Sequence, residues 1–163
     1  AEFTTQVLSP CFTFSQDGRI LAVAGEGGGG ELWDWEKPIL THHIRAGTGA
    51  IRACAFSNNG RYLLFGLDSP KSNAFLFDRQ TDQSIALDGH THMVRATAFT
   101  QDDKYCITGS WDQTVRVWSI SNGRLAAASL TEDAISAIQA EGRIIHVVDH
   151  ARRPNYYKLE IET

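Results

Sequence analysis

The sequence predicts an all-β fold built from about four similar antiparallel sheets. Three segments align without a gap: "CFTFSQDGRILAVAGE", "ACAFSNNGRYLLFGLD" and "ATAFTQDDKYCITGSW". Their shared phenylalanines recur at successive intervals of 42 and 43 residues, at Phe14, Phe56 and Phe99. A weaker fourth copy follows in "AISAIQAEGRIIHVVDH". A period of about 40 residues in a strand-like pattern indicates repeated units that bury their apolar faces against one another.

Each unit consists of short alternating strands separated by polar turns. The first turns are Gln16-Asp17-Gly18, Asn58-Asn59-Gly60 and Gln101-Asp102-Asp103, which are hairpin signals. The third strands are "ELWDW", "NAFLFDR", "TVRVWSI" and "YYKLEI", and the fourth strands are "PILTHHI", "QSIALDG" and "RLAAASL". We expect a single domain over 1–163, with units at about 6–45, 50–88, 93–130 and 134–163, the last of them lacking its outermost strand.

The third unit resembles a WD-repeat blade. It contains Gly89-His90, then Gly109-Ser110-Trp111-Asp112, then Val115-Arg116-Val117-Trp118. This resemblance implies a β-propeller of four-stranded blades, with the first strand of each unit innermost. Because the fourth unit has no outermost strand, we expect this chain to be the C-terminal part of a larger, seven-bladed ring. Upstream blades of the same protein, or another chain, would complete it.

The resemblance also implies a structural hydrogen-bond tetrad in the third unit, made of His90, Ser110, Asp112 and Trp118. A buried indole, hydroxyl and imidazole each need a partner. A Ser-His-Asp set also suggests a hydrolase. The resemblance, however, implies that the serine hydroxyl bonds the indole, and it implies no oxyanion hole. We therefore interpret these residues as structural and predict no catalytic residue.

Family geometry places several residues on one rim of the ring, called the top face. These are Arg52, Arg95 and Trp111, together with the loop residues Lys71, Arg152 and Arg153. Arginines beside a tryptophan suit an acidic or phosphorylated peptide, whereas solvated rim charges are the simpler alternative. Cys54, on the same strand as Arg52, is either a reachable reactive thiol or a buried inert one.

Composition and charge argue against other classes of partner. The 163 residues carry a formal net charge of -4, and no apolar run approaches the roughly 18 residues of a membrane helix. We therefore expect neither nucleic-acid binding nor direct membrane insertion. Three widely spaced cysteines fit thiols in a reducing compartment, so we expect an intracellular, cytoplasmic protein, with the nucleus as the alternative.

No cofactor or metal is predicted. His146 and His150 lie in a strand pattern, where about 3.3 Å per residue separates them by roughly 13 Å. The leading functional hypothesis is a non-enzymatic scaffold or adaptor that binds a protein or peptide on the top face. The alternative is a regulatory or substrate-recruiting domain of a larger enzyme, such as a ubiquitin-ligase receptor or a nucleotide-driven switch protein.

Overall fold

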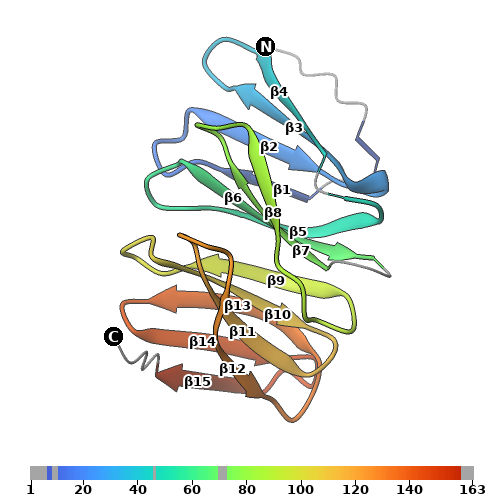
Figure 1. Cartoon of the computed structure of the whole chain (residues 1–163), viewed down its shortest axis with the longest axis vertical. Helices are drawn as coiled ribbons and strands as arrows, with labels where there is room; N and C mark the ends of the chain where they lie inside the picture. Colours follow the sequence, from blue (N-terminus) through green and yellow to red (C-terminus); the bar gives the residue numbers. More distant parts are fainter. Residues whose placement is uncertain (1–6, 9–10, 46, 70–72, 159–163) are drawn as a thin grey trace.

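The computed structural model describes residues 7–8, 11–45, 47–69 and 73–158. Within these residues the chain forms four antiparallel sheets, here called blades 1 to 4, which follow one another in sequence order along the molecule (Figure 1). The all-β prediction is confirmed. Only one short helical segment is present among the described residues, the 3-10 turn η1 at Glu26–Gly28.

The blades are meanders in which consecutive strands pair. Blade 1 contains β1 (Cys11–Phe14), β2 (Ile20–Ala24), β3 (Gly29–Asp34) and β4 (Ile39–Arg45). Blade 2 contains β5 (Ala50–Phe56), β6 (Tyr62–Asp68), β7 (Ala74–Asp78) and β8 (Gln83–Ala86). Blade 3 contains β9 (Val94–Phe99), β10 (Tyr105–Ser110), β11 (Thr114–Ser119) and β12 (Leu125–Leu130). Blade 4 contains β13 (Ile135–Glu141), β14 (Ile144–Asp149) and β15 (Pro154–Lys158).

The first hairpin of blades 1 to 3 is closed by the same local chemistry. A hydroxyl just after the first strand donates to a side-chain oxygen two residues later, as in Ser57 to Asn59 at 2.9 Å and Thr100 to Asp102 at 2.8 Å. Such side-chain contacts favour a tight turn over continued strand. The polar triplets that follow the repeated phenylalanines therefore mark the turns, as the sequence predicts.

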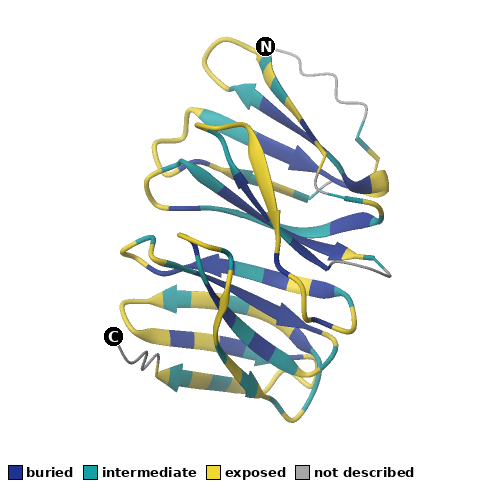
Figure 2. Ribbon diagram, in the orientation of Figure 1, coloured by how far each residue is buried: buried dark blue, intermediate teal, exposed yellow. Residues whose placement is uncertain are grey.

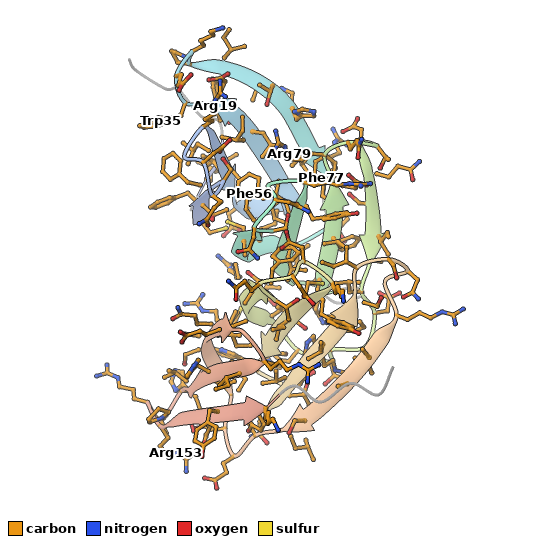
Figure 3. The ribbon with its side chains drawn as sticks, turned by 90° about the vertical axis from the view of Figure 1, so that its left-hand side faces the viewer. Arg19, Trp35, Phe56, Phe77, Arg79 and Arg153 are labelled. Carbon is orange, nitrogen blue, oxygen red and sulfur yellow. The ribbon has the colours of Figure 1, made fainter. Side chains whose placement is uncertain are left out.

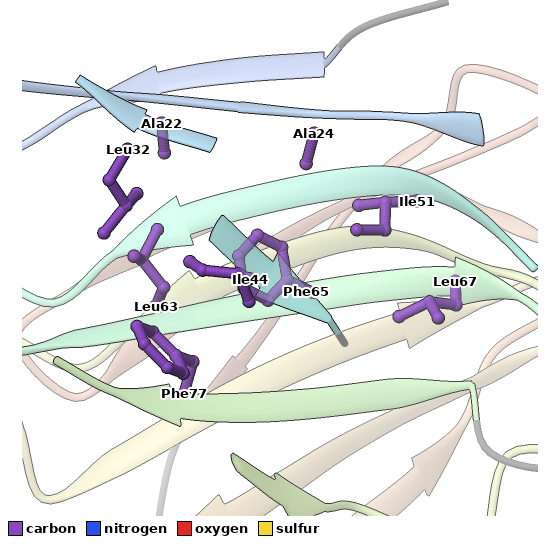
Figure 4. Close-up of a cluster of buried hydrophobic side chains, with 9 residues drawn as sticks. All are labelled: Ala22, Ala24, Leu32, Ile44, Ile51, Leu63, Phe65, Leu67 and Phe77. Atoms are coloured by element: carbon purple, nitrogen blue, oxygen red, sulfur yellow. The ribbon is translucent and has the colours of Figure 1, made fainter. Parts of the chain in front are cut away.

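The apolar core lies between successive blades. One cluster joins blades 1 and 2 (Figure 4), a second joins blades 2 and 3, and a third joins blades 3 and 4. In blades 2, 3 and 4 the last strand is the least buried, and all four residues of β8 are exposed (Figure 2). This gradient is expected where each sheet buries its faces against its neighbours and leaves its outermost edge in water.

The first strands of the four blades face one hollow. Residues of β1, β5, β9 and β13 line a cavity of about 310 Å³, here called the central hollow. These strands carry Phe14, Phe56, Phe99 and Ile138, so the predicted innermost strands are the ones found. In the part of the chain that the structure describes, no helix has the length and apolar character of a membrane span.

Candidate functional site

A buried hydrogen-bond network holds blade 3 together. The Trp118 indole donates from Nε1 to the Thr108 hydroxyl at 2.8 Å, and His90 Nε2 lies 2.7 Å from the same hydroxyl. His90 Nδ1 lies 2.8 Å from Asp112 Oδ2, in the turn between β10 and β11. His90, Thr108 and Trp118 are each at most 5% exposed. The network thus supplies the partners that these polar groups need inside a core.

The sequence prediction of Ser110 in this network was wrong. Trp118 pairs with Cys106 in the β10–β11 ladder. Thr108 is therefore the next residue of β10 that points to the same face as Cys106, and Ser110 lies two residues beyond Thr108. That step is about 6.6 Å, which is too far for the indole to reach. Thr108 therefore takes the place of Ser110, while the other three members are as predicted.

The Ser110 hydroxyl has a separate structural role. It lies 3.0 Å from the carbonyl oxygens of His92 and Met93, to which it donates, and it accepts the Asp112 backbone N–H at 3.1 Å. These contacts join the end of β10 to the loop that precedes β9. The contact between a nucleophile and an imidazole base that a hydrolase needs is not formed by Ser110 and His90, because His90 is bonded to Thr108 and Asp112.

Asp112 anchors the network electrostatically. Burial raises the pKa of its carboxyl, but hydrogen bonds from His90, Thr114 and the Thr91 backbone outweigh burial and hold that pKa below its usual range. Hydrogen bonds to the charged form of a carboxylate have this effect. Asp112 is therefore ionised at neutral pH and fixes both the turn and the imidazole.

Two other blades use different contacts in place of this network. In blade 1, Trp33 donates from Nε1 to Glu31 at 3.1 Å. In blade 2, Phe77 occupies the position of the tryptophan and is buried. Blade 2 is tied to blade 3 instead by Asn73, whose amide donates to the His90 carbonyl at 3.0 Å.

The central hollow brings together three of the residues singled out in the sequence. Arg52 and Cys54 of β5 and Arg95 of β9 all line it. Arg52 is paired with Glu26 of η1 at 3.0 Å, a partner that the sequence analysis did not anticipate. Arg95 is exposed. The two arginines therefore differ, because a ligand carboxylate would compete with Glu26 only at Arg52.

Trp111 is the centre of an aromatic cluster between blades 3 and 4. Its ring stacks on His92 with the centroids 5.8 Å apart, and it meets His150 edge-on at 5.9 Å. The indole remains 39% exposed. Trp111 is predicted from the sequence, whereas the two histidines are not. The equivalent positions of residues 111 and 150 after β10 and β14 were the available signal for one of them.

The remaining predicted cations are placed unequally. Arg153 binds two carboxylates, Asp149 at 2.9 Å and Glu132 at 2.6 Å, and lies at the blade 4 end of the molecule (Figure 3). Arg152 is exposed, in the same turn. Lys71 lies outside the described residues. Arg153 is thus largely occupied in holding its own loop.

Cys54 lies beside a second thiol, that of Cys11. Its hydrogen bond to the neighbouring Cys11 sulfur, together with burial, raises the pKa of Cys54. The Cys11 pKa is instead lowered, chiefly by the same hydrogen bond and further by the Arg52 charge. The lower pKa of the pair therefore lies with Cys11, which is not among the residues predicted from the sequence.

Among the residues that the structure describes, no group of three or more His, Cys, Asp and Glu side chains could hold a metal ion.

Sheets that follow one another around a shared hollow, each with its first strand innermost, define β-propeller blades. The WD40 family model (WD domain, G-beta repeat) matches residues 81–119. The solved structure of the RRP9 WD40 repeats superposes with a TM-score of 0.80 at 18% identity, over 95% of this chain and 52% of that one. Residues 81–119 thus match a WD40 repeat, and the described part of the chain has the fold of WD40 propeller structures.

Curated relatives are longer than this chain. Protein ANTHESIS POMOTING FACTOR 1 of Arabidopsis thaliana is 29% identical over 120 residues, which cover 69% of this chain and 36% of the relative. Ribosome biogenesis protein BOP1 homolog of Aedes aegypti is 35% identical over 77 residues, which cover 47% of this chain and 8% of the relative. The chain thus matches about a third or less of the length of these relatives.

Proposed function

We propose that this chain is a non-enzymatic interaction scaffold that binds an acidic or phosphorylated peptide on its top face. This face is defined by the turns after β2, β6, β10 and β14 and by the mouth of the central hollow. The match to the WD40 repeat model and the propeller fold support a protein-interaction scaffold in general terms. The observation that carries the specific proposal is the half-exposed Trp111 ring, held between His92 and His150. Each of these histidines is followed within three residues by an exposed arginine, Arg95 or Arg152.

The chemistry of this face suits a negatively charged peptide. A guanidinium pairs with carboxylate or phosphate through two parallel hydrogen bonds, and Arg95 and Arg152 are exposed to do so. An exposed indole beside arginines adds apolar contact area, which is typical of residues that dominate binding energy. Arg52 and Arg153 contribute less, because each already binds an acidic side chain.

A peptide-binding measurement tests this proposal. Fluorescence anisotropy is measured with an array of peptides in matched acidic, phosphorylated and neutral versions. We expect the acidic or phosphorylated versions to bind, and Arg95→Gln and Trp111→Ala each to weaken binding about tenfold, which corresponds to about 1.4 kcal/mol.

The matched control is Trp35→Ala. Trp35 is also half-exposed, at 45%, but it follows the third strand of blade 1 and so lies at the opposite end of its sheet (Figure 3). This variant should bind like the unaltered chain. Equal binding of neutral and acidic peptides, or unchanged affinity in both top-face variants, would refute the proposal.

We further propose that additional WD40 blades, from the same protein or another chain, complete the ring. The four blades correspond to 52% of the RRP9 WD40 chain. The face of blade 1 turned away from blade 2 exposes Phe12 (68%) and Phe14 (39%), and the far face of blade 4 exposes Tyr156 (78%). Adjacent exposed aromatic rings on a sheet face are typical of a surface that another blade covers.

Light scattering on the 163-residue chain tests this completion. We expect a mass that rises with concentration, because the exposed blade faces pair with other copies. Adding about three upstream blades should give a monomer. A well-folded monomer of the short chain at all concentrations would contradict the proposal and would indicate a closed four-bladed ring.

A further inference from the structure

Two of the three cysteines meet where blades 1 and 2 pack together. Cys11 lies at the start of β1 and Cys54 lies in the middle of β5, so 42 intervening residues separate them in sequence. Both side chains pack against the apolar cluster between the two blades, and both line the central hollow. Each thiol also shifts the pKa of the other through a side-chain hydrogen bond. The two cysteines are thus neighbours that face the same hollow.

Charge distinguishes the two thiols. The hydrogen bond from Cys54 is the main cause that lowers the pKa of Cys11, and the Arg52 guanidinium adds to it, although burial opposes both. The same hydrogen bond and burial raise the pKa of Cys54. Since the thiolate is the nucleophile, this asymmetry favours Cys11 as the attacking sulfur and Cys54 as the sulfur that resolves the product.

The third cysteine provides an internal contrast. Cys106 is fully buried in the core between blades 2 and 3, and burial raises its pKa to about 12. It has neither access to the central hollow nor a sulfur partner among the described cysteines. The arrangement at Cys11 and Cys54 is therefore specific to the boundary between blades 1 and 2.

We propose that Cys11 and Cys54 form a redox site, in which a peroxide that enters the central hollow converts them into an intramolecular disulfide joining blades 1 and 2. The Cys11 thiolate attacks one peroxide oxygen, the O–O bond breaks, and the leaving hydroxide takes a proton to become water, which leaves a sulfenic acid. The Cys54 sulfur then attacks the Cys11 sulfur. The S–O bond breaks, and the departing hydroxide takes the Cys54 proton as a second water. Two thiols are oxidised and one peroxide is reduced.

Mass spectrometry with hydrogen peroxide as the probe tests this assignment on the full chain. After oxidation, remaining thiols are alkylated under denaturing conditions and the chain is digested with trypsin. We expect a loss of about 2 Da from the unalkylated chain, a single alkylated cysteine at Cys106, and a linked peptide pair, 1–19 with 53–61. On a non-reducing gel the chain should run as a monomer. Three alkylated cysteines, a sulfinic acid at Cys11 or an interchain disulfide would overturn the proposal.

Variants separate the roles of the two sulfurs. Cys106→Ser should keep the linked pair, whereas Cys54→Ser should stop at a sulfenic acid on Cys11 that dimedone captures. Arg52→Gln should shift the pH profile of Cys11 alkylation to higher pH, an effect that a purely structural residue would not produce. If Cys11→Ser leaves Cys54 as readily oxidised as in the unaltered chain, Cys11 is not the attacking thiol. The linked-peptide result on the unaltered chain decides the main proposal even if a variant fails to fold.

Discussion

Replacing Thr108 by valine is expected to lower the free energy of unfolding by about 3 kcal/mol. Valine keeps the shape of the side chain but removes the hydroxyl that accepts from Trp118 and bonds His90 Nε2. Both groups are buried and would lose their partner. Each buried polar group left unpaired costs about 1 to 3 kcal/mol. Urea unfolding at one fixed chain concentration measures the change.

Two comparison variants make this result specific. Thr91→Val carries out the same chemical change at an exposed residue, whose backbone rather than hydroxyl contacts Asp112, and should change stability by less than about 0.5 kcal/mol. Ser110→Ala removes hydrogen bonds to backbone groups and should cost about 1 kcal/mol. A larger loss in Ser110→Ala than in Thr108→Val would restore the sequence-based tetrad and reject the one described here.

The difference between Thr108 and Ser110 shows how far the sequence could lead. The pattern of Gly89-His90, Trp111-Asp112 and Trp118 places the network in blade 3, because these residue types occupy fixed places in the WD repeat that this unit resembles. Which of two hydroxyls on the same face of β10 meets the indole depends on strand register. Register comes from the packing of whole strands against one another, so local composition does not decide it.

The top face shows a second limit of sequence reasoning. The equivalence of Arg52 and Arg95 follows from the aligned repeats, and both do line the central hollow. Their different ion-pair states do not follow, because Glu26 reaches Arg52 from η1 of the preceding blade. The contact between Cys11 and Cys54 has the same origin. Cys54 aligns with Thr97 and Cys11 aligns with Ala96, so no repeated feature announces that these sulfurs meet across two blades.

The close approach of blades 2 and 3 depends on a glycine, and this gives the second large expected effect. Gly66 lies in β6 at the position of Gly109 in β10, and Ala24 occupies it in β2. A Cβ at Gly66 would lie 2.6 Å from Val94 Cγ1 and 2.7 Å from the Val94 carbonyl oxygen. Val94 is itself fully buried at the start of β9, so neither atom can move without shifting a strand.

Gly66→Ala is therefore expected to destabilise the fold by about 3 kcal/mol, since overpacking a closed core typically costs about 1 to 3 kcal/mol and a backbone contact relaxes least. The control is Gly30→Ala, in β3. There the nearest atom to the new Cβ is 3.4 Å away, which is ordinary contact, and alanine also reduces the freedom of the unfolded chain. We expect Gly30→Ala to remain within about 1 kcal/mol of the unaltered chain.

A double-mutant cycle with Val94→Ala locates the strain of Gly66→Ala. Truncating Val94 removes the Cγ1 contact but leaves the carbonyl oxygen in place. Val94→Ala should therefore restore only part of the stability lost in Gly66→Ala. The two substitutions should couple by more than about 0.5 kcal/mol. Full additivity, or equal effects of Gly66→Ala and Gly30→Ala in urea unfolding, would show that blades 2 and 3 do not pack as tightly as described. Partial rescue would instead mean that spacing between blades is set by the backbone of β9. A small residue at this position would then be a requirement of the repeat rather than of one side-chain contact.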